Sequence, residues 1–542
     1  MLLVYPEFFP TYWGMQHYLP LVKQKALMPP LGLITIAALT PGDYEFRLID
    51  LNCEPLKDSD LAWADLVLLS AMLPQRKTLF QAARRCRQAG KMVVMGGPFP
   101  TACAEECRPF ADVLVLNEGE VTWPMFLKDL EAGQVKPLYT SPEKPDVTKT
   151  PCPRFDLLNM AYYAIVPIQF SRGCPFQCEF CDIIVMYGRQ PRTKTPEQLV
   201  RELDAVYATG YRGVVFIVDD NFIGNKKEVA TLLPAITRWN QAHERPFYYG
   251  TEASVNLADD RELLDAMSAA NFMWVFLGIE TPSAEGLKET HKLQNVTHFA
   301  LSDRVKAIQN AGILVYGGFI IGFDSDTEDI FDRQIQFITE AAIPNAMIGP
   351  LVALPGTPLH QRLKSEGRLL EAGGDEDRTV ASGYTNIETK ISRRALLEGH
   401  RRIIQAIYSP RAYFDRAVTA FSRLPRAKTL GGRLKHFLWM SAVMFRGTSV
   451  KRDQSEPKPS LWAKLSSFRA LMQQLPIEYR REARRFAWQI LKNCPEHFPR
   501  ALGYMLMGYH YYRFTVENML PELDESLARL GSPSPQPRAH AA

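Results

Sequence analysis

Short apolar runs alternate with amphipathic segments over the first 135 residues. Five runs have the length of a strand and are almost continuously apolar, and the segments between the later ones, such as residues 76–90, repeat apolar residues at helical spacing. Near-continuous apolar strands that alternate with helices are typical of parallel sheets covered on both faces. The pattern therefore predicts a doubly wound α/β domain with strands at residues 2–6, 46–51, 65–71, 91–97 and 112–116.

Small and acidic residues follow the later strands of this predicted domain. In doubly wound sheets, ligands bind outside the carboxyl ends of the strands. The residues at those ends are therefore candidate ligand contacts: Ser70, Gly96, Gly97, Glu118 and Gly119.

The alternation resumes with a longer period between about residues 160 and 355. A helix is predicted after Thr195, which precedes Pro196 as an N-cap residue precedes proline at the first helical position. Six strand–helix units predict a partial (β/α)6 barrel, whose functional groups gather at the carboxyl ends of the strands. The strands are expected at residues 164–170, 213–219, 247–255, 272–279, 314–322 and 346–354.

The remaining segments differ in pattern from both α/β regions. Residues 136–158 are rich in Pro, Lys and Thr without periodicity, which predicts a linker. Beyond about residue 390 the strands cease and amphipathic helices follow. We therefore expect an α/β domain, a linker, a barrel, a helical C-terminal domain and a disordered tail at residues 1–135, 136–158, 159–370, 371–530 and 531–542.

Composition places the chain among globular proteins with several cores. It has 542 residues, of which 46% are apolar and 23% charged. Its longest apolar runs, such as residues 437–445, are about half of the roughly 20 residues that span a bilayer, so no transmembrane helix is predicted. The N-terminus lacks a basic leader and is interpreted as a buried strand. Nine cysteines without a secretion signal favour a reduced, cytoplasmic setting.

Basic residues are concentrated towards the C-terminus. Residues 391–542 hold 26 Lys and Arg against 11 Asp and Glu, a net charge of +15, whereas the rest of the chain carries −11. Two interpretations stay open: the basic helices contact an anionic membrane surface, or they are solvated and simply pack on the barrel. No nucleic-acid partner is predicted, because the basic residues are dispersed along helices without a recognisable binding module.

Three cysteines, Cys174, Cys178 and Cys181, follow the first predicted barrel strand with the spacing CxxxCxxC. Three thiolates in one loop can ligate three irons of a cubane cluster, and the fourth iron is then open to a small molecule. Structural zinc is a competing interpretation, but it needs four ligands and no partner pair of cysteines occurs in this region. Three buried thiols without a metal are the other alternative.

The spacing, the aromatic Phe180 before the last cysteine, and the place after the first barrel strand resemble the radical S-adenosylmethionine (SAM) superfamily. This resemblance implies a 4Fe-4S cluster that binds SAM at its unique iron and cleaves it to methionine and a 5′-deoxyadenosyl radical. It also implies an electron donor such as flavodoxin or ferredoxin. By the same resemblance, SAM is bound by Phe180, Asp220, Glu252, Ser254, Glu280, Gly317 and Gly318, the glycines letting backbone approach the adenine.

The preceding α/β domain, with "MPPLGLITIAALTP" at Met28 to Pro41, resembles the cobalamin-binding domain of cobalamin-dependent radical SAM enzymes. The resemblance implies that the residues at its strand ends contact cobalamin. The cobalamin signature D-x-H-x-x-G has a histidine where this sequence has Asn52. An amide is a poor cobalt ligand compared with imidazole. The lower face of cobalt is therefore predicted to lack histidine. A domain that kept the fold and lost the cofactor is the alternative.

The architecture is similar to that of methylases acting on hopanoid lipids. The predicted function is methylation, with methylcobalamin, of an unactivated carbon in a hydrophobic lipid or polycyclic small molecule. A radical cyclisation or rearrangement without methyl transfer, or a cobalamin sensor without catalysis, are the rival functions. The predicted location is cytoplasmic, with peripheral contact to the inner face of the membrane as the open alternative above.

Overall fold

The computed structural model describes residues 1–296, 298–370, 384–426, 429–445, 473 and 475–531. The predicted disordered tail lies outside this range except for Gly531, and so does the predicted boundary at residue 371. None of the described helices has both the length and the apolar composition that crossing a bilayer requires.

The N-terminal sheet has six parallel strands in the order β2-β1-β3-β4-β5-β6. Its strands are β1 (Leu2–Tyr5), β2 (Arg47–Asp50), β3 (Leu66–Ser70), β4 (Met92–Gly96), β5 (Val113–Val115) and β6 (Leu138–Tyr139). Its helices are α1 (Leu31–Leu39), α2 (Asp58–Trp63), α3 (Arg76–Gln88), α4 (Pro98–Ala102), α5 (Ala104–Cys107) and α6 (Gly119–Glu131). The predicted doubly wound sheet is confirmed, and β6 shows that part of the expected linker pairs with it.

The central sheet also has six parallel strands, in the order β14-β13-β12-β11-β10-β7, so β7 and β14 are open edges. Its strands are β7 (Ile165–Ile168), β10 (Gly213–Ile217), β11 (Phe247–Ala253), β12 (Phe272–Glu280), β13 (Leu314–Ile321) and β14 (Asn345–Pro350). Helices of this region are α7 (Ile183–Met186), α8 (Pro196–Ala208), α9 (Lys226–Ala242), α10 (Arg261–Ala269), α11 (Ala284–Glu289), α12 (Leu301–Asn310), α13 (Ile330–Glu340) and α14 (Pro358–Ser365). This is the predicted partial barrel.

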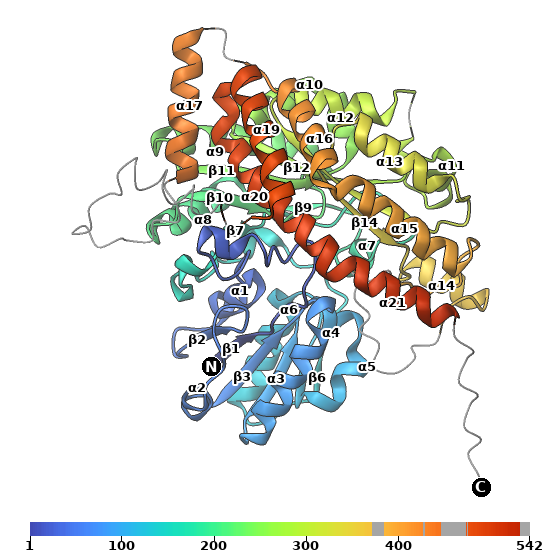
Figure 1. Cartoon of the computed structure of the whole chain (residues 1–542). Coiled ribbons are helices and arrows are strands. Elements are labelled where there is room, and N and C mark those ends of the chain that lie inside the picture. The colour runs from blue at the N-terminus through green and yellow to red at the C-terminus, as the bar shows by residue number, and fades with distance from the viewer. Residues whose placement is uncertain (297, 371–383, 427–428, 446–472, 474, 532–542) are drawn as a thin grey trace.

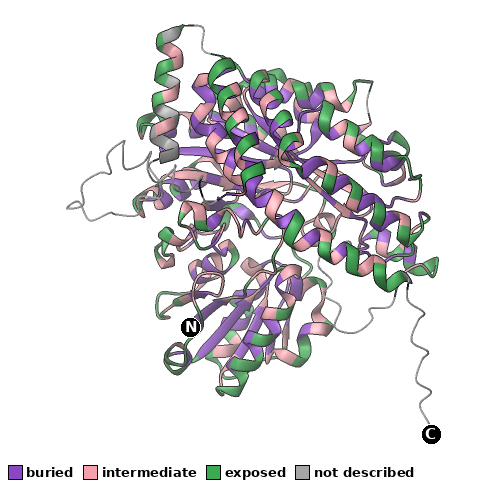
Figure 2. Cartoon of the chain, in the orientation of Figure 1, coloured by how far each residue is buried: buried purple, intermediate pink, exposed green. Residues whose placement is uncertain are grey.

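The C-terminal region is helical, as predicted, and packs on the barrel (Figure 1). A π-helical turn at Thr515–Met519 joins α20 to α21, so that the two form one long rod. Figure 2 shows buried residues along both sheets and on the helix faces turned towards them. The helices are α15 (Arg393–Tyr408), α16 (Pro410–Arg423), α17 (Leu430–Phe445), α19 (Ile477–Asn493), α20 (Phe498–Phe514) and α21 (Leu520–Gly531).

The segment between β1 and α1 leaves the N-terminal domain and packs on the other two regions. Tyr12 belongs to the core that the barrel shares with the C-terminal helices, and its hydroxyl lies 3.2 Å from Thr515 Oγ1. The amide of Ala164 donates to Ala26, and the amide of Ile165 donates to Leu27 at 2.9 Å. The segment therefore pairs beside the open edge at β7 and joins the three parts of the chain.

Candidate functional site

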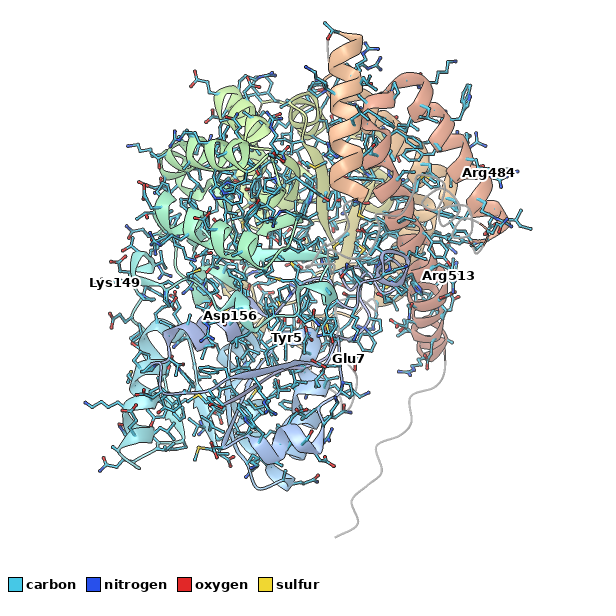
Figure 3. All side chains as sticks on the ribbon, turned by 90° about the vertical axis from the view of Figure 1, so that its left-hand side faces the viewer. Tyr5, Glu7, Lys149, Asp156, Arg484 and Arg513 are labelled. Carbon is cyan, nitrogen blue, oxygen red and sulfur yellow. The ribbon has the colours of Figure 1, made fainter. Side chains whose placement is uncertain are left out.

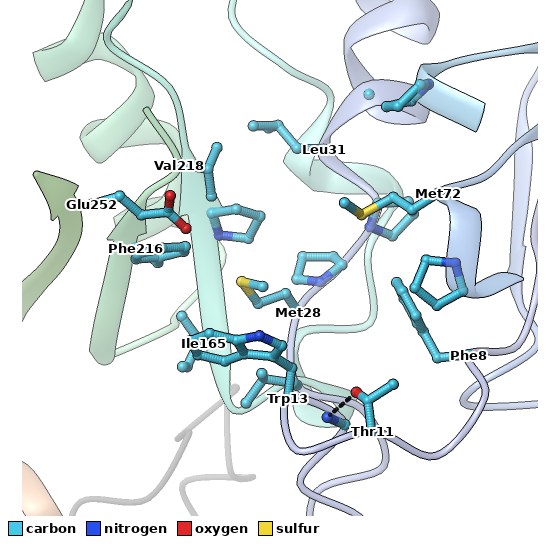
Figure 4. A pocket seen from close by; sticks show the side chains of 18 of the residues that line it. Phe8, Thr11, Trp13, Met28, Leu31, Met72, Ile165, Phe216, Val218 and Glu252 are labelled. Carbon is cyan, nitrogen blue, oxygen red and sulfur yellow. Dashed lines mark hydrogen bonds between the residues drawn. The ribbon is translucent and has the colours of Figure 1, made fainter. Parts of the chain in front are cut away.

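A cavity of about 1470 Å³ lies where the N-terminal domain, the barrel and helix α20 meet. Figure 4 shows Phe216, Val218 and Glu252 on its barrel side. The N-terminal side carries apolar residues of the segment and loops that face the barrel: Phe8, Trp13, Met28, Leu31 and Met72. The carboxyl ends of both parallel sheets therefore border one cavity.

The cysteine loop lies between two short strands, β8 (Ser171–Arg172) and β9 (Arg192–Thr193), next to the end of β10. Gly173 opens the loop with a φ of +92°, and a side chain there would meet the Gly188 carbonyl, so this position requires glycine. The Gly173 amide donates to Asp220 Oδ2 at 3.1 Å. Asp219 accepts from the amides of Phe170 and Ser171 at 2.8 and 2.9 Å. Two acids at the end of β10 thus fix the backbone that carries the thiols.

Two side-chain amides point at the sulfur atoms. Asn221 Nδ2 lies 3.8 Å from Cys174 Sγ, and Gln294 Nε2 lies 3.4 Å from Cys178 Sγ. Burial raises the pKa of the Cys181 thiol to about 12, so its thiolate needs positive charge or N–H donors nearby. These donors fit a thiolate-ligated cluster, whose sulfur atoms accept hydrogen bonds of this kind.

A cubane and a single metal ion make different demands on the three thiols. Among the residues that the structure describes, no three Cys, His, Asp or Glu side chains converge as a mononuclear site requires. The thiolates of a cubane each bind a different iron and need no such convergence. The three thiols and their amide donors therefore fit the predicted 4Fe-4S cluster.

A buried ion pair lies beside the thiols. Lys292 Nζ donates to Glu280 Oε1 at 2.7 Å, and the ammonium is 5.8 Å from the centre of the Phe180 ring. Burial opposes its charge, but Glu280 and the nearby thiols of Cys178 and Cys181 raise the pKa of Lys292 above its ordinary value. Glu280 has a φ of +66°, which is rare for a residue with a side chain. Such strain is common at functional sites.

Glu252 projects from β11 into the cavity (Figure 4). Burial, together with the charges of Asp220 and Asp219, raises the pKa of this carboxyl group to about 8. Burial likewise raises the pKa of Asp220 to about 6. A carboxyl group held neutral in this way ionises when a cation binds beside it, which fits a ligand with ammonium and sulfonium groups.

The other predicted SAM contacts occupy different positions. Ser254 is buried and its hydroxyl bonds to Asn221 and Asn256, so it supports the neighbour of Cys174. Gly318 lines the cavity together with Phe180, Asp220, Glu252 and Glu280, whereas Gly317 does not line it and a Cβ there would meet the Phe319 ring. Only one of the two glycines therefore exposes backbone to the cavity.

All six residues predicted to contact cobalamin line the same cavity: Asn52, Ser70, Gly96, Gly97, Glu118 and Gly119. Gly97 has a φ of +92°, and a side chain there would meet Ser70 Oγ. A Cβ at Gly96 would lie 2.7 Å from the Val115 carbonyl oxygen. The glycines keep the ends of β4 and β5 close-packed and leave backbone facing the cavity, which fits a large cofactor bound mainly through backbone.

Both polar atoms of the Asn52 side chain are hydrogen-bonded within the protein. Its Nδ2 donates to Asp50 Oδ1 at 2.6 Å and to the Pro6 carbonyl at 3.2 Å, and its Oδ1 accepts from the Phe8 amide at 2.9 Å. The residue at the histidine position therefore holds the loop after β1. The lower cobalt face without histidine stays a prediction.

Glu118 has an electrostatic role that the sequence did not reveal. Its carboxylate accepts from Arg172 at 2.9 Å and from Arg192 at 2.8 Å, and Arg172 also pairs with Glu120 at 2.7 Å. Both arginines belong to the strands that flank the cysteine loop. This network joins the end of the predicted cobalamin site to the base of the predicted cluster site.

Sequence reasoning missed Lys292, Gln294 and Arg172. Lys292 and Gln294 lie in a loop without a motif, more than a hundred residues after the cysteines. The sequence does give a signal for Asn221, because it directly follows Asp220, a predicted site residue. Only the folded chain brings the other three to the thiols or to Glu118.

Three family models match the chain. They are described as a B12 binding domain at residues 20–127, the radical SAM superfamily at residues 168–338, and a domain of unknown function, DUF4070, at residues 357–520. Together they cover the three regions of the fold.

Curated relatives match most of the chain. An uncharacterized methyltransferase from Synechocystis sp. is 46% identical over 461 residues, which are 83% of this chain and 84% of that protein. The hopanoid C-2 methylase from Rhodopseudomonas palustris is 36% identical over 420 residues, which are 77% of this chain and 78% of that protein.

Solved structures share the fold at low identity. The cobalamin-dependent SAM radical enzyme OxsB, with aqua-cobalamin bound, is 14% identical and has a TM-score of 0.59 over 97% of this chain and 83% of that chain. The radical SAM methyltransferase TsrM from Kitasatospora setae, with cobalamin and a 4Fe-4S cluster bound, is 16% identical and has a TM-score of 0.52 over 69% of this chain and 79% of that chain.

Proposed function

The chain belongs to the cobalamin-binding radical SAM enzymes, and we propose that its substrate is a polycyclic lipid of the hopanoid type. Its activity is that of a methyltransferase that acts on an unactivated carbon of a hydrophobic substrate. The observation that carries the proposal is the apolar cavity bordered by both cofactor regions. The hopanoid C-2 methylase at 36% identity supports the same substrate class.

The cluster residues are proposed to act as a unit. Cys174, Cys178 and Cys181 ligate the 4Fe-4S cluster, and Asn221 and Gln294 donate hydrogen bonds to its thiolates. When bound, the cluster supplies the electron that cleaves SAM. The donor that reduces it, such as flavodoxin or ferredoxin, stays a prediction.

The acids at the strand ends are proposed to position SAM. Glu252 becomes ionised beside the cationic groups of SAM, and Asp220 keeps the cysteine loop in place. Glu280 holds Lys292, whose ammonium faces the thiols. Phe180 and Gly318 contribute apolar surface and open backbone to the same part of the cavity.

Cobalamin, which carries the methyl group when bound, is proposed to sit on the carboxyl ends of β3, β4 and β5. Ser70, Gly96, Gly97 and Gly119 offer backbone and small side chains there. The Met72 side chain is 49% exposed at the end of β3 and lines the cavity, so it would present an apolar surface to a cobalamin bound there.

The substrate proposal predicts a specific set of products. Anaerobic incubation of the reconstituted protein with SAM, cobalamin, a reductant and a hopanoid extract should yield methionine, 5′-deoxyadenosine, S-adenosylhomocysteine and a lipid heavier by one CH2 unit. Mass spectrometry detects all four. Formation of 5′-deoxyadenosine and an altered lipid without S-adenosylhomocysteine would instead support cyclisation or rearrangement.

We also propose that α19 contacts an anionic membrane surface. One face of this helix exposes basic and large apolar side chains at helical spacing: Ile477, Arg481, Arg484, Trp488 and Leu491. Arg484 lies at the periphery of the molecule in Figure 3, and the Trp488 side chain is 61% exposed. A helix of this kind gains both apolar burial and attraction to anionic lipids.

Vesicle flotation tests this contact. The protein should float with vesicles that contain phosphatidylglycerol and not with neutral phosphatidylcholine vesicles, and Arg481→Glu with Arg484→Glu should remove the difference. As a control, Arg261→Glu changes an exposed arginine on the barrel helix α10. Equal flotation with both vesicle types, or no effect of the charge reversal, would rule the contact out.

A further inference from the structure

One end of the apolar cavity carries a buried arginine. Arg500 lies on α20, is 6% exposed and lines the cavity together with Gly503, Tyr504 and Met507 of the same helix face. Its guanidinium lies 6.0 Å from the centre of the Phe421 ring and donates to the carbonyl oxygens of Met273 and Gly312. These two bonds engage only part of a group that has five N–H donors.

The charge of Arg500 has no acidic partner. Within the part of the chain that the structure describes, no carboxylate lies at ion-pair distance from it, and the ionisable groups that face it are the phenols of Tyr504, Tyr316 and Tyr248. Burial consequently lowers the pKa of Arg500. A buried charge without a counter-ion is unfavourable, and a ligand oxygen that accepts from it would relieve that cost.

Arg416 provides an internal comparison. It is 2% exposed on α16 and donates to the carbonyl oxygens of Ile343 and Ile407 at 2.9 and 2.6 Å. Bonds to carbonyl groups therefore account for Arg416, which does not line the cavity. Arg500 is buried and bonded to carbonyl groups in the same way, but unlike Arg416 it lines the cavity.

Arg500 and the cluster lie at opposite ends of the barrel strands. Met273, which accepts from Arg500, is near the start of β12, and Glu280, which pairs with Lys292 beside the thiols, is at its end. Seven residues of strand at roughly 3.3 Å each separate them by about 23 Å. The cavity lining includes residues at both ends.

A row of aromatic rings crosses the sheet next to the Arg500 end of the cavity. The rings of Phe216 and Trp274 are 5.1 Å apart, and those of Trp274 and Tyr316 are 4.8 Å apart, all three lining the cavity. Gly250 on the intervening strand β11 leaves room for the Trp274 indole, since a Cβ there would overlap it. The stack crosses the sheet as a rigid apolar ridge.

From this arrangement we propose that Arg500 binds the oxygen-bearing polar terminus of an elongated amphipathic substrate. The rings of that substrate pack across Phe216, Trp274 and Tyr316, and its opposite, apolar end points along the strands towards the cluster and receives the methyl group. This inference rests on the proposed function and adds the orientation of the substrate. The recognised chemistry is a hydroxyl or carboxylate oxygen on a polycyclic hydrocarbon.

Binding of three tetracyclic probes tests the polar end. Cholestane has no polar group, cholesterol has a hydroxyl group, and cholesteryl hemisuccinate has a carboxylate. Each probe competes with dehydroergosterol for the full-length reconstituted protein. Energy transfer from tryptophan to the bound dehydroergosterol measures the displacement. Hydrogen bonds to a charged group predict that the two oxygen-bearing probes bind on the order of tenfold more tightly than cholestane.

Arg500→Met should remove this preference, and Arg500→Lys should keep it for the carboxylate, because lysine retains the charge. If Arg500→Met is unstable, Arg500→Lys still tests the role of the charge, because it should bind the carboxylate probe more tightly than cholestane. Arg261→Gln, which changes an exposed arginine on the barrel helix α10, should leave the preference unchanged. Equal binding of the three probes by the unaltered protein, or an unaltered preference in Arg500→Met, would overturn the proposal.

The position of the new methyl group separates this inference from the proposed function. In a methylated lipid product, nuclear magnetic resonance should place the methyl group in the ring farthest from the polar terminus. A product methylated next to the polar terminus would contradict the orientation while leaving the proposed function intact. A third outcome is that no methylated hopanoid forms, while the unaltered protein prefers the oxygen-bearing probes and Arg500→Met does not. That outcome would refute the hopanoid substrate and would still support the role of Arg500.

Discussion

Replacing Cys178 by alanine is expected to abolish cleavage of SAM while cobalamin binding remains. Cys178 is the most buried of the three thiols and accepts from Gln294, so its loss removes one iron ligand and one stabilised thiolate. Loss of residues that only support metal ligands already costs about 10–100-fold, and loss of a ligand should cost more than about a hundredfold. Iron and sulfide analysis and the yield of 5′-deoxyadenosine measure the effect.

Cys494→Ala is the matched control. Cys494 is also a buried free thiol, but it follows α19 in the C-terminal region. This variant should keep its iron, its sulfide and its SAM cleavage. If Cys178→Ala retained a full cluster and normal cleavage, the assignment of the three cysteines would be wrong.

Arg172→Met is expected to lower the free energy of unfolding by about 3 kcal/mol at pH 7, because breaking a buried ion pair leaves its partner charge uncompensated. Arg172 holds Glu118 and Glu120, whose side chains are only 2% and 10% exposed. Arg192 still pairs with Glu118, so most of the loss falls on Glu120. Denaturant unfolding followed by circular dichroism gives the difference.

The same variant has a predicted pH dependence. Burial opposes ionisation of Glu120, but Arg172 more than offsets it, so the pKa of Glu120 is below its ordinary value. A carboxylate with a lowered pKa stabilises the fold above its unfolded pKa, and that contribution is lost as pH falls through the folded pKa. The difference between Arg172→Met and the unaltered protein should therefore shrink below about pH 4.5.

Arg154→Met separates this network from an ordinary surface pair. Arg154 pairs with Asp156 at 2.7 Å, but the two side chains are 43% and 60% exposed. Removing an exposed pair should change stability by at most about 1 kcal/mol. Equal effects of the two substitutions would mean that the interdomain network contributes no more than a surface contact.

The cofactors and both parallel sheets could be predicted from local sequence. A strand of a parallel sheet is buried on both faces, so it must be continuously apolar, and runs such as residues 66–70 and 314–321 show this directly. The cysteine spacing is equally local, since one loop supplies all three thiols. Gly97 was also visible, because a close turn after a strand requires glycine.

The partners of individual polar side chains could not be predicted. Glu118 follows a strand as a ligand contact would, yet it pairs with Arg172 and Arg192, which lie more than fifty residues away. Lys292 and Gln294 have no motif and reach the thiols only because the segment after α11 packs against the cysteine loop. The predicted domain boundaries stay predictions, although residues 8–27 pack on the barrel and β6 pairs within the expected linker.

The two sheets, the helical C-terminal region and the cysteine motif follow from local sequence, because hydrophobic period and ligand spacing act within short segments of chain. Three features follow only from the folded chain: one cavity joins both sheets, Asn52 bonds to the loop after β1, and Arg500 lies at the far end of the cavity without a counter-ion. Burial and charge pairing depend on which distant segments meet, and no local pattern encodes that meeting.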